Sequence, residues 1–310
     1  MSWSVVICTR DRAALLAETL ASLRALADPG VPYEVVVVDN GSTDGTRAVV
    51  EAHAAASRVP VRYVYEPRGG LSAARNAGVA AARGEAIAFT DDDVVVDPGW
   101  LAAFARALAT HPVDFLGGRV VPRWGAPRPP WLPAGRTRGE IWGALALLDY
   151  GDRERPLAKP LGANMAFRAA ALRAAGGFRE DLGRDAASLK GQEVPELLQR
   201  LAAAGGRGGW YVPDAVVHHW VPAERLTKRY FRRWFYWKGV SRALVRDRVF
   251  VDGVWLPAAQ VRRLAGLPRG LYKDALRAAG RLLVRAAAGD RAGAFEAETR
   301  LWYAAGYARA

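Results

Sequence analysis

The sequence has almost no cysteine and contains no long apolar run. Cys8 is the single cysteine among 310 residues, which excludes an intramolecular disulfide framework and a zinc site built from several cysteines. No stretch approaches the roughly 18 uninterrupted apolar residues that a membrane-spanning helix needs. The apolar stretch 2–8 is also too short for a secretory signal, and Arg10 follows it almost at once. We therefore expect a cytoplasmic protein, with peripheral attachment to the inner face of the membrane as an alternative location.

Acidic residues are outnumbered by basic ones. The chain has 44 lysines and arginines against 31 aspartates and glutamates, which gives a net charge of +13. Such an excess favours anionic partners, and nucleotide phosphates, nucleic acids and acidic lipid headgroups all fit it. Because 51% of the residues are hydrophobic, a chain of this length can bury a large core, and disorder throughout is excluded.

Strand-like and helix-like segments alternate through the first hundred residues. Apolar, β-branched stretches predict strands, whereas Leu16, Leu20 and Leu23 recur at helical spacing. This alternation predicts an α/β fold with a doubly wound, mostly parallel sheet, whose ligands bind beyond the carboxyl ends of the strands. The predicted strands are 3–8, 33–39, 61–65, 86–89, 113–121, 161–168 and 210–220, and the predicted helices include 42–56, 72–82 and 196–204, together with one that starts near Pro98.

The composition changes near residue 222. From there the pattern is helical, basic and aromatic, and it stays mainly helical to the end of the chain, with about three helices after residue 254. We therefore predict two domains, an α/β domain over 1–221 and a helical, basic and aromatic C-terminal extension over 222–310. Within the extension, the side chains expected to pack are Leu276, Leu283, Trp302 and Tyr303.

Three adjacent carboxylates, Asp91, Asp92 and Asp93, follow the predicted strand 86–89. Like charges this close repel one another, so the cluster needs a cation or hydrogen-bond donors to offset it. Carboxylates in an Asp-x-Asp arrangement supply the oxygen ligands that magnesium or manganese takes, and the ion would also hold a diphosphate. The alternative is a solvated acidic turn that caps the next helix, with Asp97 as the cap.

Other polar residues end the first two predicted strands. Thr9 and Arg10 follow the first strand, and Asp39 ends the second. In a doubly wound sheet these strand ends open onto one edge, so we expect Thr9 and Asp39 to converge with Asp91–Asp93. Taken alone, Asp39 would be interpreted as an Asx-turn residue, but the convergence favours a ligand site.

The same segments resemble the motifs of family 2 glycosyltransferases. The resemblance covers about residues 3–220, and the ordered set of motifs is specific although each one is short. It implies a GT-A fold for 1–221 and an inverting enzyme that moves a sugar from a nucleoside diphosphate to a hydroxyl group. The matching stretches are 35–46 (VVVVDNGSTDGT), 69–78 (GGLSAARNAG), 87–93 (IAFTDDD), 162–168 (GANMAFR), 176–178 (GGF) and 212–219 (VPDAVVHH).

The resemblance also implies roles for the residues at the strand ends. Thr9 and Asp39 would contact the base and ribose of the nucleotide, and Arg75 would approach a phosphate. Asp91 would face the ribose, and Asp93 would bind the divalent cation, manganese or magnesium, that bridges the diphosphate. The residues assigned to the nucleotide-sugar site are Thr9, Arg10, Asp39, Arg75, Asp91 and Asp92.

The general base is assigned to the segment 191–196 (GQEVPE). An inverting transferase needs a carboxylate beside the acceptor hydroxyl, opposite the leaving group, to remove its proton. The family usually shows a Gly-Glu-Asp element here, whereas this chain has Gln192 in place of an acid. Glu193 is predicted to be the base, with Glu196 as the second choice. The alternative is that both acids only occupy the first turn of a helix, where carboxylates suit the helix dipole.

Two adjacent histidines, His218 and His219, follow a strand-like pair of valines. Neighbouring residues of a strand point to opposite faces, so at most one of the two enters the site. In family members with a similar element, a histidine at the position of His219 is sometimes a metal ligand, so His219 is predicted to complete the metal site with Asp93. A half-buried strand histidine without a ligand role is the alternative.

Residues 222–248 interleave lysines and arginines with aromatic residues. Phe231, Trp234 and Phe235 fall largely on one side of a helix, and Arg225 and Arg229 fall on another. Packing of the aromatic side on the catalytic domain is the favoured interpretation. A basic amphipathic helix can also lie on a membrane surface, and lipid-linked acceptors in the family support that alternative. Nucleic-acid binding fits the same composition but is the least favoured.

Together these features predict a metal-assisted glycosyltransferase of cell-envelope glycan biosynthesis. Its expected partners are a nucleoside-diphosphate sugar and a glycan or lipid-linked acceptor, such as a polysaccharide, a glycolipid or another cell-surface glycan precursor. The alternative is a catalytically degenerate module of the same fold that binds a nucleotide or a glycan, which the altered segment 192–195 keeps open.

Overall fold

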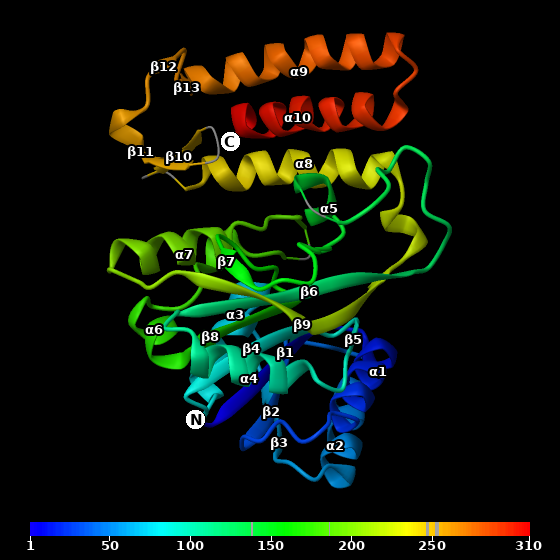
Figure 1. The fold of residues 1–310 in the computed structure, drawn as a ribbon, viewed down its shortest axis with the longest axis vertical. Helices are drawn as coiled ribbons and strands as arrows, with labels where there is room; N and C mark the ends of the chain where they lie inside the picture. The colour runs from blue at the N-terminus through cyan, green and yellow to red at the C-terminus, as the bar shows by residue number, and fades with distance from the viewer. Residues whose placement is uncertain (138, 186, 246–247, 252–253) are drawn as a thin grey trace. The chain divides into compact units, whose positions relative to one another are not determined.

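The computed structural model describes residues 1–137, 139–185, 187–245, 248–251 and 254–310 (Figure 1). Contacts within the chain divide it into two compact units. The second unit contains the predicted extension and also takes up two earlier segments, which the sequence did not indicate. The first unit comprises Met1–Arg123, Arg136–Ala186 and Glu193–Trp220, and the second comprises Trp124–Gly135, Ala187–Gln192 and Val221–Ala310.

Among the described residues, nine strands form one sheet in the order β3-β2-β1-β4-β8-β6-β9-β5, with β7 beside β9. The strands β3, β2, β1 and β4 run parallel, whereas β8 joins β4 and β5 joins β9 in antiparallel fashion. The strands are β1 (Trp3–Thr9), β2 (Tyr33–Asp39), β3 (Val61–Tyr65), β4 (Ala86–Asp91), β5 (Val94–Val96), β6 (Phe115–Trp124), β7 (Arg155–Leu157), β8 (Asn164–Arg168) and β9 (Gly209–Val221).

The helices of the first unit alternate with these strands, as the predicted α/β fold requires. The valine-rich β1 and β2 are buried along almost their whole length, which is the pattern of parallel strands covered on both faces. The helices are α1 (Ala13–Arg24), α2 (Thr46–Ala56), α3 (Leu71–Ala81), α4 (Trp100–Thr110), α5 (Glu140–Gly143), α6 (Ala169–Ala174) and α7 (Glu193–Ala203), with a short 3₁₀ turn η1 (Glu180–Leu182).

Two predicted helix starts are wrong. The helix expected over 196–204 begins three residues earlier, at Glu193. The helix expected to begin at Ser42 begins four residues later, at Thr46. The backbone N–H groups of Ser42 and Thr43 donate to the carboxylates of Asp39 and Asp11, both at 2.7 Å. The carboxylates of Asp39 and Asp11 therefore hold this segment in a turn. Hydrogen bonds from the backbone to such side chains compete with the hydrogen bonds of a helix.

Asn164, at the start of β8, joins several elements of the first unit. Its side chain is fully buried, and its Oδ1 accepts a hydrogen bond from the indole Nε1 of Trp100 at 2.8 Å. Its Nδ2 donates to the carbonyl oxygens of Arg119 at 2.8 Å and Ala215 at 2.7 Å. One amide therefore links α4, β6 and β9 to the centre of the sheet.

We expect Asn164→Ala to lower the free energy of unfolding by about 2–4 kcal/mol, because it leaves one buried donor and two buried carbonyls without their partner. Urea denaturation followed by circular dichroism measures the change. A loss below about 1 kcal/mol would show that these groups find other partners.

The second unit is helical with two small hairpins. In place of the expected three helices after residue 254, the described residues there form two, because short strands occupy much of the stretch before residue 269. The elements are η2 (Ala223–Arg225), α8 (Lys228–Ala243), β10 (Arg248–Val251), β11 (Val254–Pro257), η3 (Ala258–Gln260), β12 (Arg263–Leu264), β13 (Leu267–Pro268), α9 (Arg269–Ala287) and α10 (Arg291–Arg309).

Helix α10 lies between α8 and α9 (Figure 1). Phe231 and Phe235 of α8 are buried, and the ring of Phe231 lies 6.0 Å from that of Phe295 on α10. Gly306 permits this close approach, because a Cβ atom there would clash with the carbonyl of Tyr236. The prediction placed this packing on the catalytic domain, whereas the ring of Phe231 packs against α10 within the second unit.

Several apolar residues of the extension are not packed as predicted. Leu276 is 75% exposed, Leu283 is 72% exposed and Trp302 is 40% exposed, while Tyr303 is half-buried. The reason is that α9 buries the face that carries Ala278, and Leu276 and Leu283 lie on the other side of the helix. No helix in the described part of the chain combines the length and apolar character that crossing a membrane requires.

Candidate active site

The polar ends of three neighbouring strands meet at one edge of the sheet. Thr9 at the end of β1 pairs in register with Asp39 at the end of β2, and Cys8 pairs with Asp91 at the end of β4. This is the convergence expected from the sequence, and it follows directly from the parallel register of β1 with both neighbours.

The acidic cluster after β4 is buried rather than solvated. Asp92 is 4% exposed and Asp93 is 5% exposed. Thr9 Oγ1 donates to Asp92 Oδ2 at 2.7 Å. Arg12 Nη1 donates to Asp92 Oδ1 at 2.9 Å and to Asp93 Oδ2 at 3.1 Å. Burial raises the pKa of Asp92 to about 6, against the opposing effect of the Arg12 guanidinium.

Arg12 is a site residue that sequence reasoning missed. It lies three residues beyond the end of β1, at the start of α1, and it contacts carboxylates about 80 positions away in the chain. Its only sequence signal is a basic side chain in the same strand-end loop as Thr9 and Arg10. Arg10 itself is exposed, with its Nε 3.6 Å from a carboxylate oxygen of Asp11.

His219 completes a possible metal site. Antiparallel pairing of β5 with β9 sets Val94 opposite His219, which brings the imidazole beside the acidic cluster. His219 Nε2 lies 3.4 Å from Asp93 Oδ1, and the side chain is 2% exposed. Ligand atoms of Asp91, Asp93 and His219 all lie within 4.8 Å of one another. The predicted pair of Asp93 and His219 is thus joined by Asp91, which had been assigned to the ribose.

The neighbouring histidine faces elsewhere, as the strand alternation predicts. His218 Nε2 lies 2.7 Å from Asp97 Oδ1. Asp97 was the expected helix cap of a solvated acidic turn, but its carboxylate pairs with His218, and Gly99 is the N-cap of α4. The burial of Asp92 and Asp93 likewise excludes a solvated turn.

Asp39 is held in place by two hydrogen bonds. Its Oδ1 accepts from the backbone N–H of Ser42 at 2.7 Å, and its Oδ2 accepts from the Tyr63 hydroxyl at 2.7 Å. Burial and the nearby Asp39 carboxylate raise the pKa of Tyr63 to about 12, so the phenol stays protonated and donates. Tyr63, on β3, had no sequence motif to single it out.

Arg75 and Glu193, predicted to play separate roles, form one buried ion pair. Arg75 Nη1 lies 2.7 Å from Glu193 Oε1, and the two side chains are 4% and 9% exposed. Gly162 leaves room for this guanidinium, because a Cβ there would clash with it. Glu193 Oε2 is buried and has no hydrogen-bond partner among the described residues. Glu196, the second choice for the base, instead pairs with Arg200 at 2.8 Å one turn along α7.

We expect Arg75→Met to lower the free energy of unfolding by about 3–5 kcal/mol, because it leaves Glu193 as a buried carboxylate without its cation. Adding Glu193→Gln to that variant removes the uncompensated charge and should restore at least half of the loss. Chemical denaturation of both variants measures this. Equal stability of the single and double variants would contradict a buried ion pair.

Comparison with known proteins identifies the family to which this chain belongs. Residues 4–173 match the model of glycosyl transferase family 2, and the chain therefore belongs to that family. The predicted family is confirmed, and the chain is a glycosyltransferase that acts on nucleotide sugars. These findings favour an enzyme over the non-catalytic binding module considered as the alternative.

Among its relatives is the succinoglycan biosynthesis protein ExoM of Rhizobium meliloti, which is 30% identical over 234 residues, or 73% of this chain and 71% of the relative. The glucosyl-dolichyl phosphate glucuronosyltransferase of Haloferax volcanii is 25% identical over 251 residues, or 79% of this chain and 77% of the relative.

Two solved structures show a similar fold. A mannosyltransferase from Pyrobaculum calidifontis, in complex with GDP-Man and Mn²⁺, has a TM-score of 0.64 at 23% identity, covering 99% of this chain and 86% of that one. Residues 1–349 of S. aureus TarS have a TM-score of 0.54 at 18% identity, covering 96% and 90%. The predicted GT-A-type α/β fold with a helical C-terminal extension is confirmed.

Proposed function

We propose that this glycosyltransferase is metal-assisted and inverting, and that it transfers a sugar from a nucleoside diphosphate to a hydroxyl group of a glycan or lipid-linked acceptor. The observation that carries the proposal is the meeting of Asp91, Asp93 and His219 at the strand edge that also holds Thr9 and Asp39. The relative whose name refers to a glucosyl-dolichyl phosphate supports a lipid-linked acceptor.

The three candidate ligands fit a divalent cation. Two carboxylates suit magnesium or manganese, and an imidazole favours manganese of the two. The buried Nδ1 of His219 has no hydrogen-bond partner among the described residues, so the contacts of the imidazole lie on its Nε2 side, toward Asp93. When bound, the cation would supply positive charge beside the departing diphosphate. Arg12 adds a guanidinium at the same edge through its contacts with Asp92 and Asp93.

Thermal shift with UDP, GDP, dTDP and CDP, with and without manganese, tests the metal site. One nucleotide should stabilise the protein in a manganese-dependent way, by roughly 2.7 kcal/mol at about a hundred times its dissociation constant. We expect Asp93→Asn and His219→Gln to lose the manganese-dependent part of this shift, because each removes a ligand.

His218→Gln is the matched control, since this histidine is adjacent in sequence but contacts Asp97. It should keep the full manganese-dependent shift. An equal loss in the two histidine variants would indicate damage to β9 instead of a metal ligand. A full shift in Asp93→Asn would contradict the proposed site.

Glu193 is the proposed general base. Arg75 holds its Oε1, which leaves Oε2 as the atom that can accept the proton of an acceptor hydroxyl. Direct displacement with this carboxylate opposite the leaving group would invert the configuration at the anomeric carbon. Asp39, fixed by Tyr63 and Ser42, would hold the nucleotide on the other side of the reacting sugar.

We expect Glu193→Gln to reduce kcat by about 10²–10⁴-fold, because an amide cannot take the acceptor proton. Binding of the nucleoside diphosphate with manganese should be retained, which thermal shift measures in parallel. Glu196→Gln is the matched control on the same helical turn, and its kcat should stay within a few-fold of the wild type. If Glu196→Gln caused the large loss and Glu193→Gln did not, the base would be Glu196.

A further inference from the structure

Helix α9 presents large apolar side chains to solvent. Leu276, Leu283 and Val284 are 75%, 72% and 68% exposed, and Leu264 in the hairpin just before the helix is 58% exposed. The Tyr272 hydroxyl donates to the Leu264 carbonyl at 3.1 Å, which ties this hairpin to the first turns of α9. These residues account for most of the exposed large apolar side chains among the described residues.

The leucines form a stripe on the side of α9 away from its packed face. Ala278 is the buried residue of the helix among those described. At about 100° per residue, Leu276 and Leu283 lie within roughly 20° of each other and about 140–160° from Ala278 around the helix axis. Core packing within the second unit therefore does not account for them.

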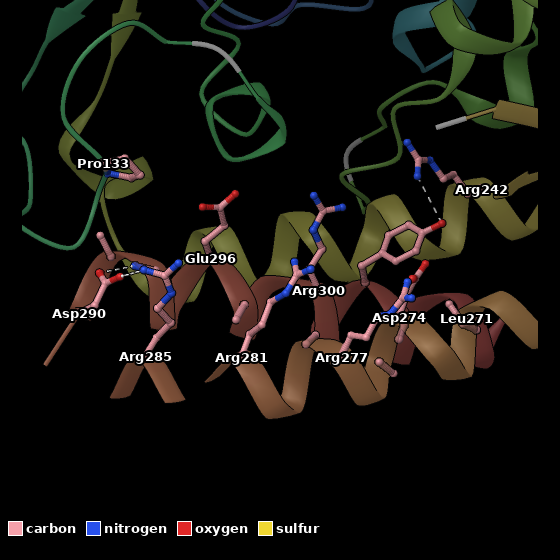
Figure 2. A pocket seen from close by; sticks show the side chains of 17 residues that line it. Pro133, Arg242, Leu271, Asp274, Arg277, Arg281, Arg285, Asp290, Glu296 and Arg300 are labelled. Atoms are coloured by element: carbon pink, nitrogen blue, oxygen red, sulfur yellow. Dashed lines mark hydrogen bonds and ion pairs between the residues drawn. The ribbon is translucent and has the colours of Figure 1, made fainter. Parts of the chain in front are cut away.

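Basic residues recur along the same helix at every fourth position: Arg269, Lys273, Arg277, Arg281 and Arg285. At about 100° per residue, Arg269 and Lys273 lie within about 80° of Leu276 and Leu283 around the helix axis, whereas Arg281 and Arg285 lie about 140–180° from them. Figure 2 shows Arg277, Arg281 and Arg285 on the flank that borders a cavity of about 720 Å³, which Arg300 of α10 also lines. Arg285 pairs with Asp290 at 2.8 Å, whereas Arg277 and Arg281 make no ion pair with the described residues. Leu276 and Leu283 do not line this cavity.

We propose that α9 is a membrane-surface helix that binds an anionic lipid bilayer, with Leu276 and Leu283 in the headgroup–acyl boundary and the exposed Arg269, Lys273 and Arg277 on lipid phosphates. A lipid bilayer is the one partner that matches both the leucines and the basic residues beside them. Its interface offers an apolar layer and negative charge a few ångströms apart. The structure thus moves the membrane contact from 222–248, where Phe231 and Phe235 are buried, to α9.

The other candidate partners would match only the leucines or only the basic residues. A second copy of the chain could cover the leucines, but a symmetric contact would bring the same basic residues of two helices together. A nucleic acid could neutralise the arginines but would leave the leucines in water. The proposal concerns the second unit and does not depend on the metal site or on Glu193.

Co-sedimentation of the full chain with vesicles tests the proposal. We expect binding to phosphatidylcholine vesicles that contain about 30% phosphatidylglycerol, weaker binding to pure phosphatidylcholine, and weakening by salt. Leu276→Ser with Leu283→Ser should reduce the partition coefficient at least about tenfold. Arg269→Gln with Lys273→Gln should remove most of the preference for anionic vesicles, because these two residues flank the leucines.

Tyr65→Ser is the matched control, because Tyr65 is 58% exposed on β3 in the first unit. It should bind vesicles as the wild type does. All substituted side chains are exposed, so unchanged melting temperatures will show that each variant is folded.

Three outcomes would overturn the proposal. The first is the absence of wild-type binding to anionic vesicles, and the second is unchanged binding of the double leucine variant. The third is evidence that this face of α9 binds a partner other than a lipid bilayer. A concentration-dependent dimer that the leucine substitutions abolish would assign the stripe to a second copy. Oligonucleotide binding that needs Arg269 and Lys273, with no binding to vesicles, would assign the helix to nucleic acid.

Discussion

Buried negative charge at the end of β4 is the constraint on which the first unit depends. Asp92 and Asp93 are almost fully removed from solvent, and an isolated buried carboxylate is strongly unfavourable. Thr9 and Arg12 reach them from β1 and the start of α1, and His219 reaches them from β9. The register of β9 on β5 therefore matters in detail, since a slip of one residue would present His218 in place of His219.

A second buried charge ties the candidate base to the fold. Arg75 on α3 and Glu193 at the first turn of α7 are 118 positions apart in sequence and 2.7 Å apart in space. Gly162, in the loop before β8, leaves the space that the guanidinium fills. A buried ion pair is weak evidence for stability, but breaking one is costly, so this pair holds the Glu193 carboxylate in one orientation. Orientation is what a base needs, because proton transfer depends first on geometry.

The fold and the convergence of strand ends could be predicted because both follow from local patterns. Valine runs specify buried parallel strands, and a residue at the end of such a strand lies at the ligand edge wherever the strand sits in the sheet. Thr9, Asp39 and Asp91 were found in this way. The contacts of Arg12 and Tyr63 could not be found, because they depend on which strands are neighbours and on their register, and neither is written in any single segment.

The second unit shows why composition does not decide which helix meets a neighbour. The aromatic α8 and the leucine-bearing α9 both have the periodicity of an amphipathic helix, and both were expected to bury their apolar side chains. Helix α10 packs against each of them, but α8 buries Phe231 and Phe235 while α9 buries Ala278. Leu271 and Leu282 of α9 are half-buried, whereas Leu276 and Leu283 lie on the side away from Ala278 and stay exposed. Isolated exposed leucines are ordinary, but a leucine stripe flanked by Arg269 and Lys273 is not, so the solvent-facing side of α9 is the one that requires a partner.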